Sequence, residues 1–118
     1  MKVCEICENS FQIKQIGSGG RNRTSCYSCI PAYMDRQERN AERAKLLVEK
    51  AAKYRLSLGC SICGYANCAA ALEWHHVNDD KEMQPATALK KSWSAYIIEV
   101  NKCILLCANC HREIHNPT

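Results

Sequence analysis

Apolar residues in the first half of the chain form a short alternating group followed by a long helical stretch. Phe11, Ile13 and Ile16 precede the glycine-rich segment GSGG, a pattern that predicts a hairpin with a flexible tip. Residues 32–58 contain no glycine or proline and many helix formers, so we expect one helix there, which Gly59 would end. The expected apolar face of this helix is thin and rich in alanine, and it comprises Met34, Ala41, Ala44, Val48, Ala51 and Leu58.

The second half of the chain, residues 59–118, predicts short strands and short helices. Its apolar groups are brief and are separated by polar segments, so no long element fits. We expect strands at AALEWHHV (70–77) and CILLC (103–107), a loop at 78–91, a short helix at 92–101 with Ser92 as its N-cap, and a final helix that begins at ANCHREIH (108–115) and ends at Pro117.

Ten cysteines compensate for a shortage of large apolar side chains. The chain has 118 residues and aromatic residues make up only 7% of it, so the buried core must be small. Domains of this kind recruit disulfides or metals. The opening stretch MKVCEICENS has no apolar signal region, and no apolar run approaches the roughly 18 residues that cross a bilayer. We therefore expect a cytosolic protein whose reduced Cys-x-x-Cys pairs bind metal.

The cysteine spacing predicts two structural zinc sites of four thiolates each. A Cys-x-x-Cys turn supplies two corners of a tetrahedron, and two such turns close the site without an open position for water. The first set is Cys4, Cys7, Cys26 and Cys29, and the second is Cys60, Cys63, Cys107 and Cys110. Two cysteines remain: we expect Cys103 to be a small buried apolar residue and Cys68 to be a free thiol.

Positive charge is concentrated in the first half of the chain. Residues 14–55 carry ten lysines and arginines against four acids, whereas residues 56–118 carry five basic and six acidic side chains. Lys14, Arg21 and Arg23 flank the glycine-rich tip and are candidate contacts to nucleic-acid phosphates. The alternative is that this charge only keeps a small protein soluble.

All four histidines lie in the last 44 residues, in two pairs. His75 and His76 are adjacent on a predicted strand, so their side chains should point to opposite faces. His111 and His115 are four residues apart on a predicted helix and should share one face. A single histidine is usually a surface or capping residue. Two pairs interleaved with a zinc clamp are not independent accidents, and they indicate a site separate from the zinc clamps.

Three segments between residues 58 and 116, CSIC, LEWHHV and LLCANCHREIH, resemble the zinc-stapled HNH endonucleases of phages and mobile elements. The resemblance implies a ββα-metal fold, in which two antiparallel strands and a helix surround one divalent ion. By this resemblance, His75, His111 and His115 would be the ligands of the ion and His76 the general base. Glu73 would orient a histidine or a basic side chain, unless it is simply a solvated strand residue.

One family position departs from the usual pattern. The asparagine that normally orients the general base would fall at Lys102, and Asn101 lies one residue earlier. The resemblance therefore leaves two possibilities for orienting His76. Either Asn101 takes the role through a register shift, or backbone carbonyls do.

The sequence thus predicts a small zinc-stabilised α+β protein with three parts. These are a zinc-ribbon-like finger (1–31), a basic linking helix (32–58) and an HNH ββα-metal domain (59–118). The expected activity is metal-dependent nicking of DNA that leaves 5′-phosphate and 3′-hydroxyl ends, with Arg112 either contacting phosphate or simply exposed. The expected ion is Mg²⁺ or Mn²⁺, with Zn²⁺ and Ni²⁺ as alternatives.

Two other functions remain open at this stage. One is a non-catalytic two-zinc module that binds nucleic acid and carries a decayed HNH site. The other is a zinc-stabilised adaptor whose helix pairs with a partner protein. The expected partners are DNA and other phage or recombination proteins, with no membrane, in the cytoplasm of a bacterial or phage-infected cell. The sequence does not determine the oligomeric state.

Overall fold

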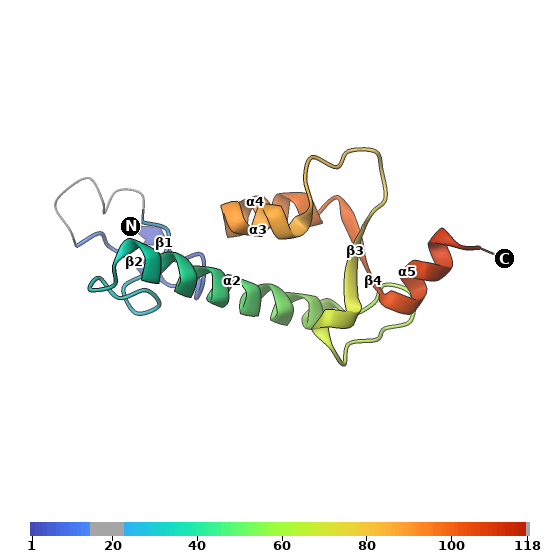
Figure 1. Cartoon of the computed structure of the whole chain (residues 1–118), viewed down its shortest axis with the longest axis horizontal. Helices are drawn as coiled ribbons and strands as arrows, with labels where there is room; N and C mark the ends of the chain where they lie inside the picture. Colours follow the sequence, from blue (N-terminus) through green and yellow to red (C-terminus); the bar gives the residue numbers. More distant parts are fainter. Residues whose placement is uncertain (15–22, 118) are drawn as a thin grey trace. The chain divides into compact units, whose positions relative to one another are not determined.

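The computed structural model describes residues 1–14 and 23–117, and its elements are shown in Figure 1. The protein is small and α+β, and the chain divides into two units, Met1–Leu47 and Val48–Thr118. The boundary falls inside the helix α2 (Arg36–Leu58), so the units do not coincide with the ends of the predicted linking helix. Among the described residues, no helix has the length and apolar character that a membrane crossing requires.

The first unit begins with a very short hairpin. Strand β1 (Lys2–Val3) pairs antiparallel with β2 (Ser10–Phe11), and the turn between them carries the first Cys-x-x-Cys. The expected hairpin around the glycine-rich tip is therefore wrong for Phe11, whose partner is Lys2. Backbone hydrogen bonds from Cys4 N to Asn9 O and from Glu8 N to Cys4 O close this turn. Ile16 and the tip itself lie outside the described residues.

Helix α2 has a clear signal at each end. The Asp35 carboxylate accepts a hydrogen bond of 2.8 Å from the Glu38 backbone N–H, which caps the first turn. The helix stops before Gly59, whose φ of +71° is the left-handed conformation that glycine adopts easily. The predicted helix is thus confirmed, although it begins at Arg36 rather than at residue 32.

The predicted apolar face of α2 is largely wrong. Ala51 is 1% exposed, as predicted, but Val48 and Leu58 are 59% and 54% exposed, and Ala41 and Ala44 are exposed as well. The large buried residue is Leu47, also 1% exposed, which shares a face with Ala51 because the two are four residues apart. Leucine offers more apolar area than alanine, which explains why burial selects the face that contains Leu47.

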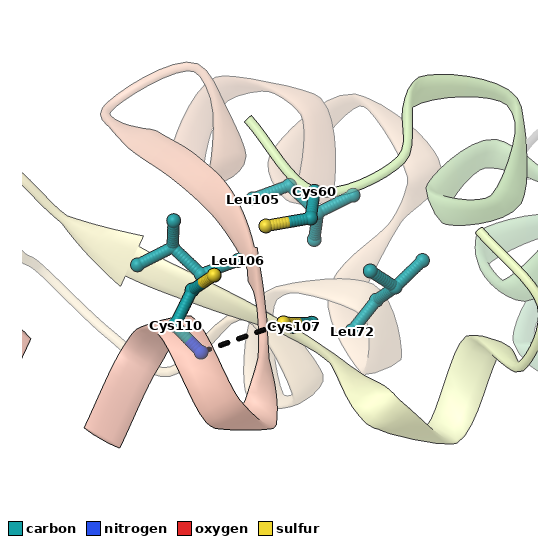
Figure 2. Packing of buried hydrophobic residues seen from close by; sticks show 6 residues of the cluster. All are labelled: Cys60, Leu72, Leu105, Leu106, Cys107 and Cys110. Atoms are coloured by element: carbon teal, nitrogen blue, oxygen red, sulfur yellow. Dashed lines mark hydrogen bonds between the residues drawn. The ribbon is translucent and has the colours of Figure 1, made fainter. Parts of the chain in front are cut away.

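The second unit contains the expected ββα arrangement. Strand β3 (Leu72–His76) follows the 3₁₀ turn η1 (Ala69–Ala71) and pairs antiparallel with β4 (Cys103–Cys107). Helix α5 (Ala108–His115) follows β4 directly, and the Cys107 Sγ accepts a hydrogen bond from the Cys110 N–H. Figure 2 shows how the core gathers at this junction, where strand, helix and cysteine turn meet; it comprises Cys60, Leu72, Leu105, Leu106, Cys107 and Cys110.

Two further helices connect β3 to β4. The expected loop at 78–91 is wrong in its second half, because α3 (Pro85–Lys91) occupies it. The signal that we missed is Pro85 at the first helical position, where proline costs no hydrogen bond. Helix α4 (Trp93–Val100) follows at once, and Ser92 caps it as predicted, accepting from the Ala95 N–H at 3.0 Å.

Helix α4 is joined to β3 by an aromatic cluster. The Trp74 indole N–H donates to the Tyr96 hydroxyl at 2.9 Å, and Tyr96 is 2% exposed. Rings of Trp74 and Tyr96 meet edge to face, and Trp93 lies against Tyr96 with centroids 5.1 Å apart. This cluster holds α4 against the face of the strand that carries Trp74 and, two residues later, His76.

Tyr96→Phe should lower the free energy of unfolding by about 1 kcal/mol, because the half-buried Trp74 N–H loses its acceptor. Urea unfolding followed by circular dichroism measures the change. Tyr65→Phe is the matched control, since the Tyr65 hydroxyl makes no hydrogen bond with the described residues. Equal losses in the two variants would mean that the Trp74–Tyr96 hydrogen bond contributes nothing.

Candidate functional site

Two groups of four cysteines have the geometry of tetrahedral metal sites. Representative Sγ–Sγ distances are 3.9 Å for Cys4 and Cys29, and 3.7 Å for Cys63 and Cys107. A disulfide would require about 2.05 Å. Four sulfurs about 2.3 Å from a zinc ion would lie about 3.8 Å apart. The donor sets therefore fit zinc, and they are the predicted ones: Cys4, Cys7, Cys26 and Cys29, and Cys60, Cys63, Cys107 and Cys110.

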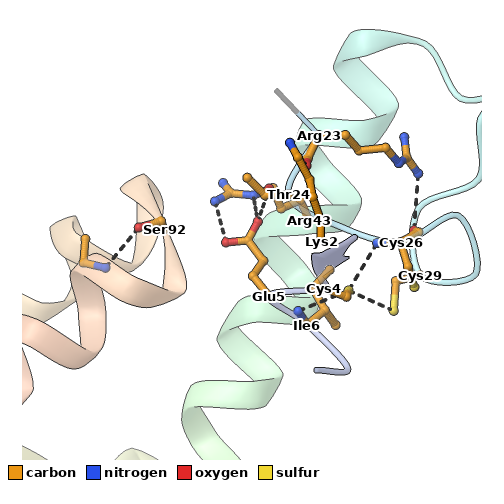
Figure 3. A network of polar contacts seen from close by, with 11 residues as sticks. Lys2, Cys4, Glu5, Ile6, Arg23, Thr24, Cys26, Cys29, Arg43 and Ser92 are labelled. Carbon is orange, nitrogen blue, oxygen red and sulfur yellow. Dashed lines mark hydrogen bonds and ion pairs between the residues drawn. The ribbon is translucent and has the colours of Figure 1, made fainter. Parts of the chain in front are cut away.

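Each tetrad contains one cysteine that its surroundings favour as a thiolate. Burial raises the pKa of Cys4, yet backbone N–H donors outweigh it and lower the pKa to about 7; the Cys26 N–H lies 3.2 Å from the Cys4 Sγ (Figure 3). The same balance of burial against N–H donors lowers the pKa of Cys60 to about 6. The thiolate is the form that binds metal, so the turns prepare one ligand in each site.

Three histidines from β3 and α5 converge on one point. The ligand atoms of His75, His111 and His115 all lie within 4.8 Å of one another. The Nε2 atoms of His111 and His115 are 3.1 Å apart. Nitrogens about 2.1 Å from a shared ion would then subtend about 95° at it, which suits neighbouring ligands of one metal. Burial, together with the nearby histidines, lowers the pKa of His75, which favours the neutral form that can bind metal.

Glu73 orients one of these histidines. Its Oε1 lies 2.7 Å from the His111 Nδ1, so Nδ1–H donates to the carboxylate and the lone pair resides on Nε2. That lone pair is on the side of the ring that faces His115. A carboxylate behind a metal-binding imidazole fixes its tautomer and its direction. Glu73 thus contacts a histidine, while its side chain is also 46% exposed to solvent.

His76 lies on the opposite face of β3 from His75. Its Nε2 is 2.7 Å from the Glu99 Oε2, and the side chains are 13% and 3% exposed. The hydrogen bond to His76 lowers the pKa of Glu99 against the opposing effect of burial, so the carboxylate is ionised at neutral pH. His76 therefore donates from Nε2, and its Nδ1 is left as the acceptor. Strand β3 thus presents a candidate metal ligand, His75, on one side and a histidine paired with a carboxylate on the other.

The partner of His76 is not the residue that we predicted. Asn101 is exposed at the C-cap of α4, and the carboxylate beside His76 belongs to Glu99. Lys102, at the usual asparagine position, lies 3.2 Å from Glu99 and 3.3 Å from Glu82. The available signal was that Glu99 is the sole acid within SWSAYIIEV. Its position beside His76 depends on how α4 packs, which no local pattern reveals.

Two of the basic residues that we predicted to contact phosphate, Lys14 and Arg23, lie beside the ring of Tyr27. The Arg23 guanidinium lies 4.0 Å from the Tyr27 ring centroid and donates to backbone carbonyls, and Lys14 Nζ is 5.2 Å from the same centroid. Arg112 is exposed on α5, and Arg21 lies outside the described residues. Of the spare cysteines, Cys68 is exposed and Cys103 is half-buried; burial is the main cause that raises the pKa of Cys103, to about 11.

The sequence of the second unit matches a known family. The family model described as AI2M/AI1M-like, HNH endonuclease, matches residues 60–111, from the first cysteine of the second tetrad to His111. No curated protein and no solved structure matches the chain at a significant level. The matched segment contains β3, β4, the first residues of α5 and all four cysteines of the second tetrad. Residues 60–111 are therefore similar to the HNH endonuclease domain that this family model describes.

Proposed function

We propose that the protein is a metal-dependent DNA endonuclease that nicks one strand and leaves 5′-phosphate and 3′-hydroxyl ends. The observation that supports this most strongly is the convergence of His75, His111 and His115 within a segment matched by an HNH family model. An all-cysteine tetrad has no room for substrate. Three imidazoles leave coordination positions open, as a catalytic site requires.

The three histidines would hold one divalent ion. When bound, such an ion supplies Lewis-acid stabilisation of the negative charge that builds up on phosphate oxygens. Imidazole nitrogens suit Mn²⁺, Ni²⁺ and Zn²⁺ better than Mg²⁺, and Mn²⁺ is our first choice. Glu73 would keep His111 directed at this position through the hydrogen bond to Nδ1.

His76 would act as the general base through Nδ1. Because Nε2–H donates to the ionised Glu99, the lone pair on Nδ1 can take the proton of the attacking water. As the water oxygen bonds to phosphorus, the bond to the 3′ oxygen breaks and the phosphate remains on the 5′ end. Glu99 is then a positioning residue, and Lys102 holds Glu99 in place.

Substrate contacts would come from exposed basic residues. Arg112 lies on α5 one residue after His111, where it can reach a phosphate next to the metal site. One such site per chain cuts one strand per encounter, so a double-strand break would need two encounters or a dimer. The cytoplasmic location and the phage or recombination partners stay predictions.

A second candidate function is a nucleic-acid-binding module without catalysis. Its support is that His76 is tied to Glu99, and that Lys102 stands where the family has asparagine. In that case the His76–Glu99 pair would only join β3 to α4. The adaptor function has no comparable observation in its favour.

His76→Ala should reduce the rate of supercoiled-plasmid nicking by about 10²–10⁴-fold, because it removes the proton acceptor. The assay uses protein that retains its two structural zinc ions, with and without added Mn²⁺. His111→Ala should also abolish nicking, but by removing a metal ligand. Cys68→Ser is the control, since that thiol is exposed and outside both tetrads. Nicking by His76→Ala at the rate of the parent would show that another group is the base.

Glu73→Gln should weaken Mn²⁺ binding at the histidine site by about 10–100-fold, because the neutral amide supports His111 less well. Calorimetric titration of the zinc-loaded protein measures this affinity. Glu113→Gln removes the same charge from an exposed position of α5 and is the matched control. If both variants lose affinity equally, general electrostatics rather than the Glu73–His111 hydrogen bond is responsible.

Each chain should contain two zinc ions in addition to any ion at the histidines. In a His111→Ala background, elemental analysis should give two zinc ions per chain, falling to one in Cys60→Ser. The loss should also unfold the second unit, because structural zinc contributes about 10–16 kcal/mol of apparent binding free energy in small metal-held domains. Cys68→Ser should retain both ions. A Cys60→Ser protein that kept two zinc ions and its thermal transition would contradict the assignment.

A further inference from the structure

The first unit contains a pocket lined by four arginines. Its volume is about 240 Å³, smaller than the roughly 300 Å³ at which pockets for drug-sized ligands begin. All of its lining residues lie within the first unit: Arg23, Thr24, Ser25, Ile30, Arg36, Arg39, Asn40 and Arg43. Its size and charge suit a small anion.

Two buried polar atoms of the pocket residues have no hydrogen-bond partner among residues 1–14 and 23–117. Ser25 is 4% exposed, and its hydroxyl makes no hydrogen bond within the described part of the chain. The same is true of the Arg23 Nε. Buried polar groups are almost always hydrogen-bonded in folded proteins, so two such atoms without a partner need an explanation. An anion that accepts from both donors provides one.

Two of the four arginines, Arg36 and Arg39, lie near the N-terminal end of α2, where the helix dipole disfavours positive charge. Arg36 is the first residue of the helix and Arg39 lies one turn later, close to the positive end of the helix dipole. Asp35 caps the helix and Glu38 offsets part of this charge. No salt bridge among residues 1–14 and 23–117 involves Arg36 or Arg39. Asp35 interacts electrostatically with Arg39, and a bound anion would offset the positive charge that the two acids leave uncompensated.

The remaining two arginines are already held in fixed positions. Arg23 donates to the carbonyls of Cys26 and Ile30, and Figure 3 shows its guanidinium beside this turn. Arg43 forms a salt bridge with Glu5, with its Nε 2.7 Å from Oε2. Their guanidinium groups are therefore ordered before any ligand arrives, which reduces the entropy lost on binding.

We propose that this pocket binds one phosphate group of a nucleic-acid backbone. Arg36 and Arg39 would donate to the phosphate oxygens through their guanidinium forks, and the Ser25 hydroxyl and Arg23 Nε–H would complete the set of donors. The binding of an anion rests on the first unit alone. The choice of a nucleic acid as the source of the phosphate rests on the proposed nuclease function.

Fluorescence anisotropy with a labelled DNA duplex tests this assignment on the full zinc-loaded chain without added divalent ion. Arg36→Gln/Arg39→Gln should bind about tenfold more weakly and reduce the salt slope by about one or more. Lys45→Gln/Lys53→Gln removes the same charge from exposed positions of α2 outside the pocket and should change binding by less than twofold. Equal losses in the two double variants would overturn the pocket in favour of diffuse charge.

Ser25→Ala probes the pocket without changing the charge. It should weaken DNA binding about threefold while the salt slope stays the same, since only a neutral donor is lost. If Ser25→Ala keeps its full zinc content and binds DNA with unchanged affinity, the Ser25 hydroxyl does not contact the phosphate. An unfolded Ser25→Ala would leave the arginine comparison to decide.

Inorganic phosphate distinguishes the two sources of the ligand. Phosphate at millimolar concentration should compete with DNA for the parent protein more strongly than for Arg36→Gln/Arg39→Gln. If phosphate raises the melting temperature through the pocket but neither it nor the substitutions affect DNA binding, the site serves free phosphate and the nucleic-acid assignment is wrong. If the pocket substitutions weaken DNA binding but the parent protein does not nick plasmid DNA, the pocket assignment stands and the proposed nuclease function is wrong.

Discussion

The closure of the second cysteine tetrad is the constraint on which the histidine site depends. Cys60 and Cys63 are separated from Cys107 and Cys110 by more than 40 residues, yet their sulfurs lie at tetrahedral distances. This closure fixes the junction between β4 and α5, and His111 is the next residue after Cys110. The core around the junction is small, so a zinc ion held by this tetrad would supply much of the stability that a larger apolar core would otherwise provide.

Strand β3 separates two kinds of chemistry by its alternation. Glu73 and His75 share one face with the α5 histidines, and Trp74 and His76 share the other with α4. The face towards α5 gathers imidazole nitrogens that could hold a metal ion, and one carboxylate hydrogen-bonded to His111. The face towards α4 is more buried and holds an ionised carboxylate between a histidine and a lysine. Successive side chains of a strand point to opposite faces, so fixing the backbone of β3 for His75 also fixes the face to which His76 points.

Much of the second unit could be predicted because its signals are local or periodic. The cysteine spacing, the histidine pair on a strand and the histidines four residues apart each predict positions through simple geometry. Helix α3 could have been predicted from Pro85, a signal that we overlooked. Glu99 could not, because its contact with His76 depends on how α4 packs against the sheet. The same holds for the pocket of the first unit, where the donors come from a turn and a helix.

The register of the β3–β4 pair has a consequence for how this sequence can vary. Leu72 lies opposite Cys107, and His76 lies opposite Cys103. Inserting a single amino acid between Leu72 and His75 would reverse the inward and outward positions of every later side chain in the strand. Such an insertion would turn His75 towards Glu99 and carry His76 towards the α5 imidazoles. We therefore expect that related sequences differ in length among residues 78–84, beyond the strand. Within β3 itself, they should differ only by substitution.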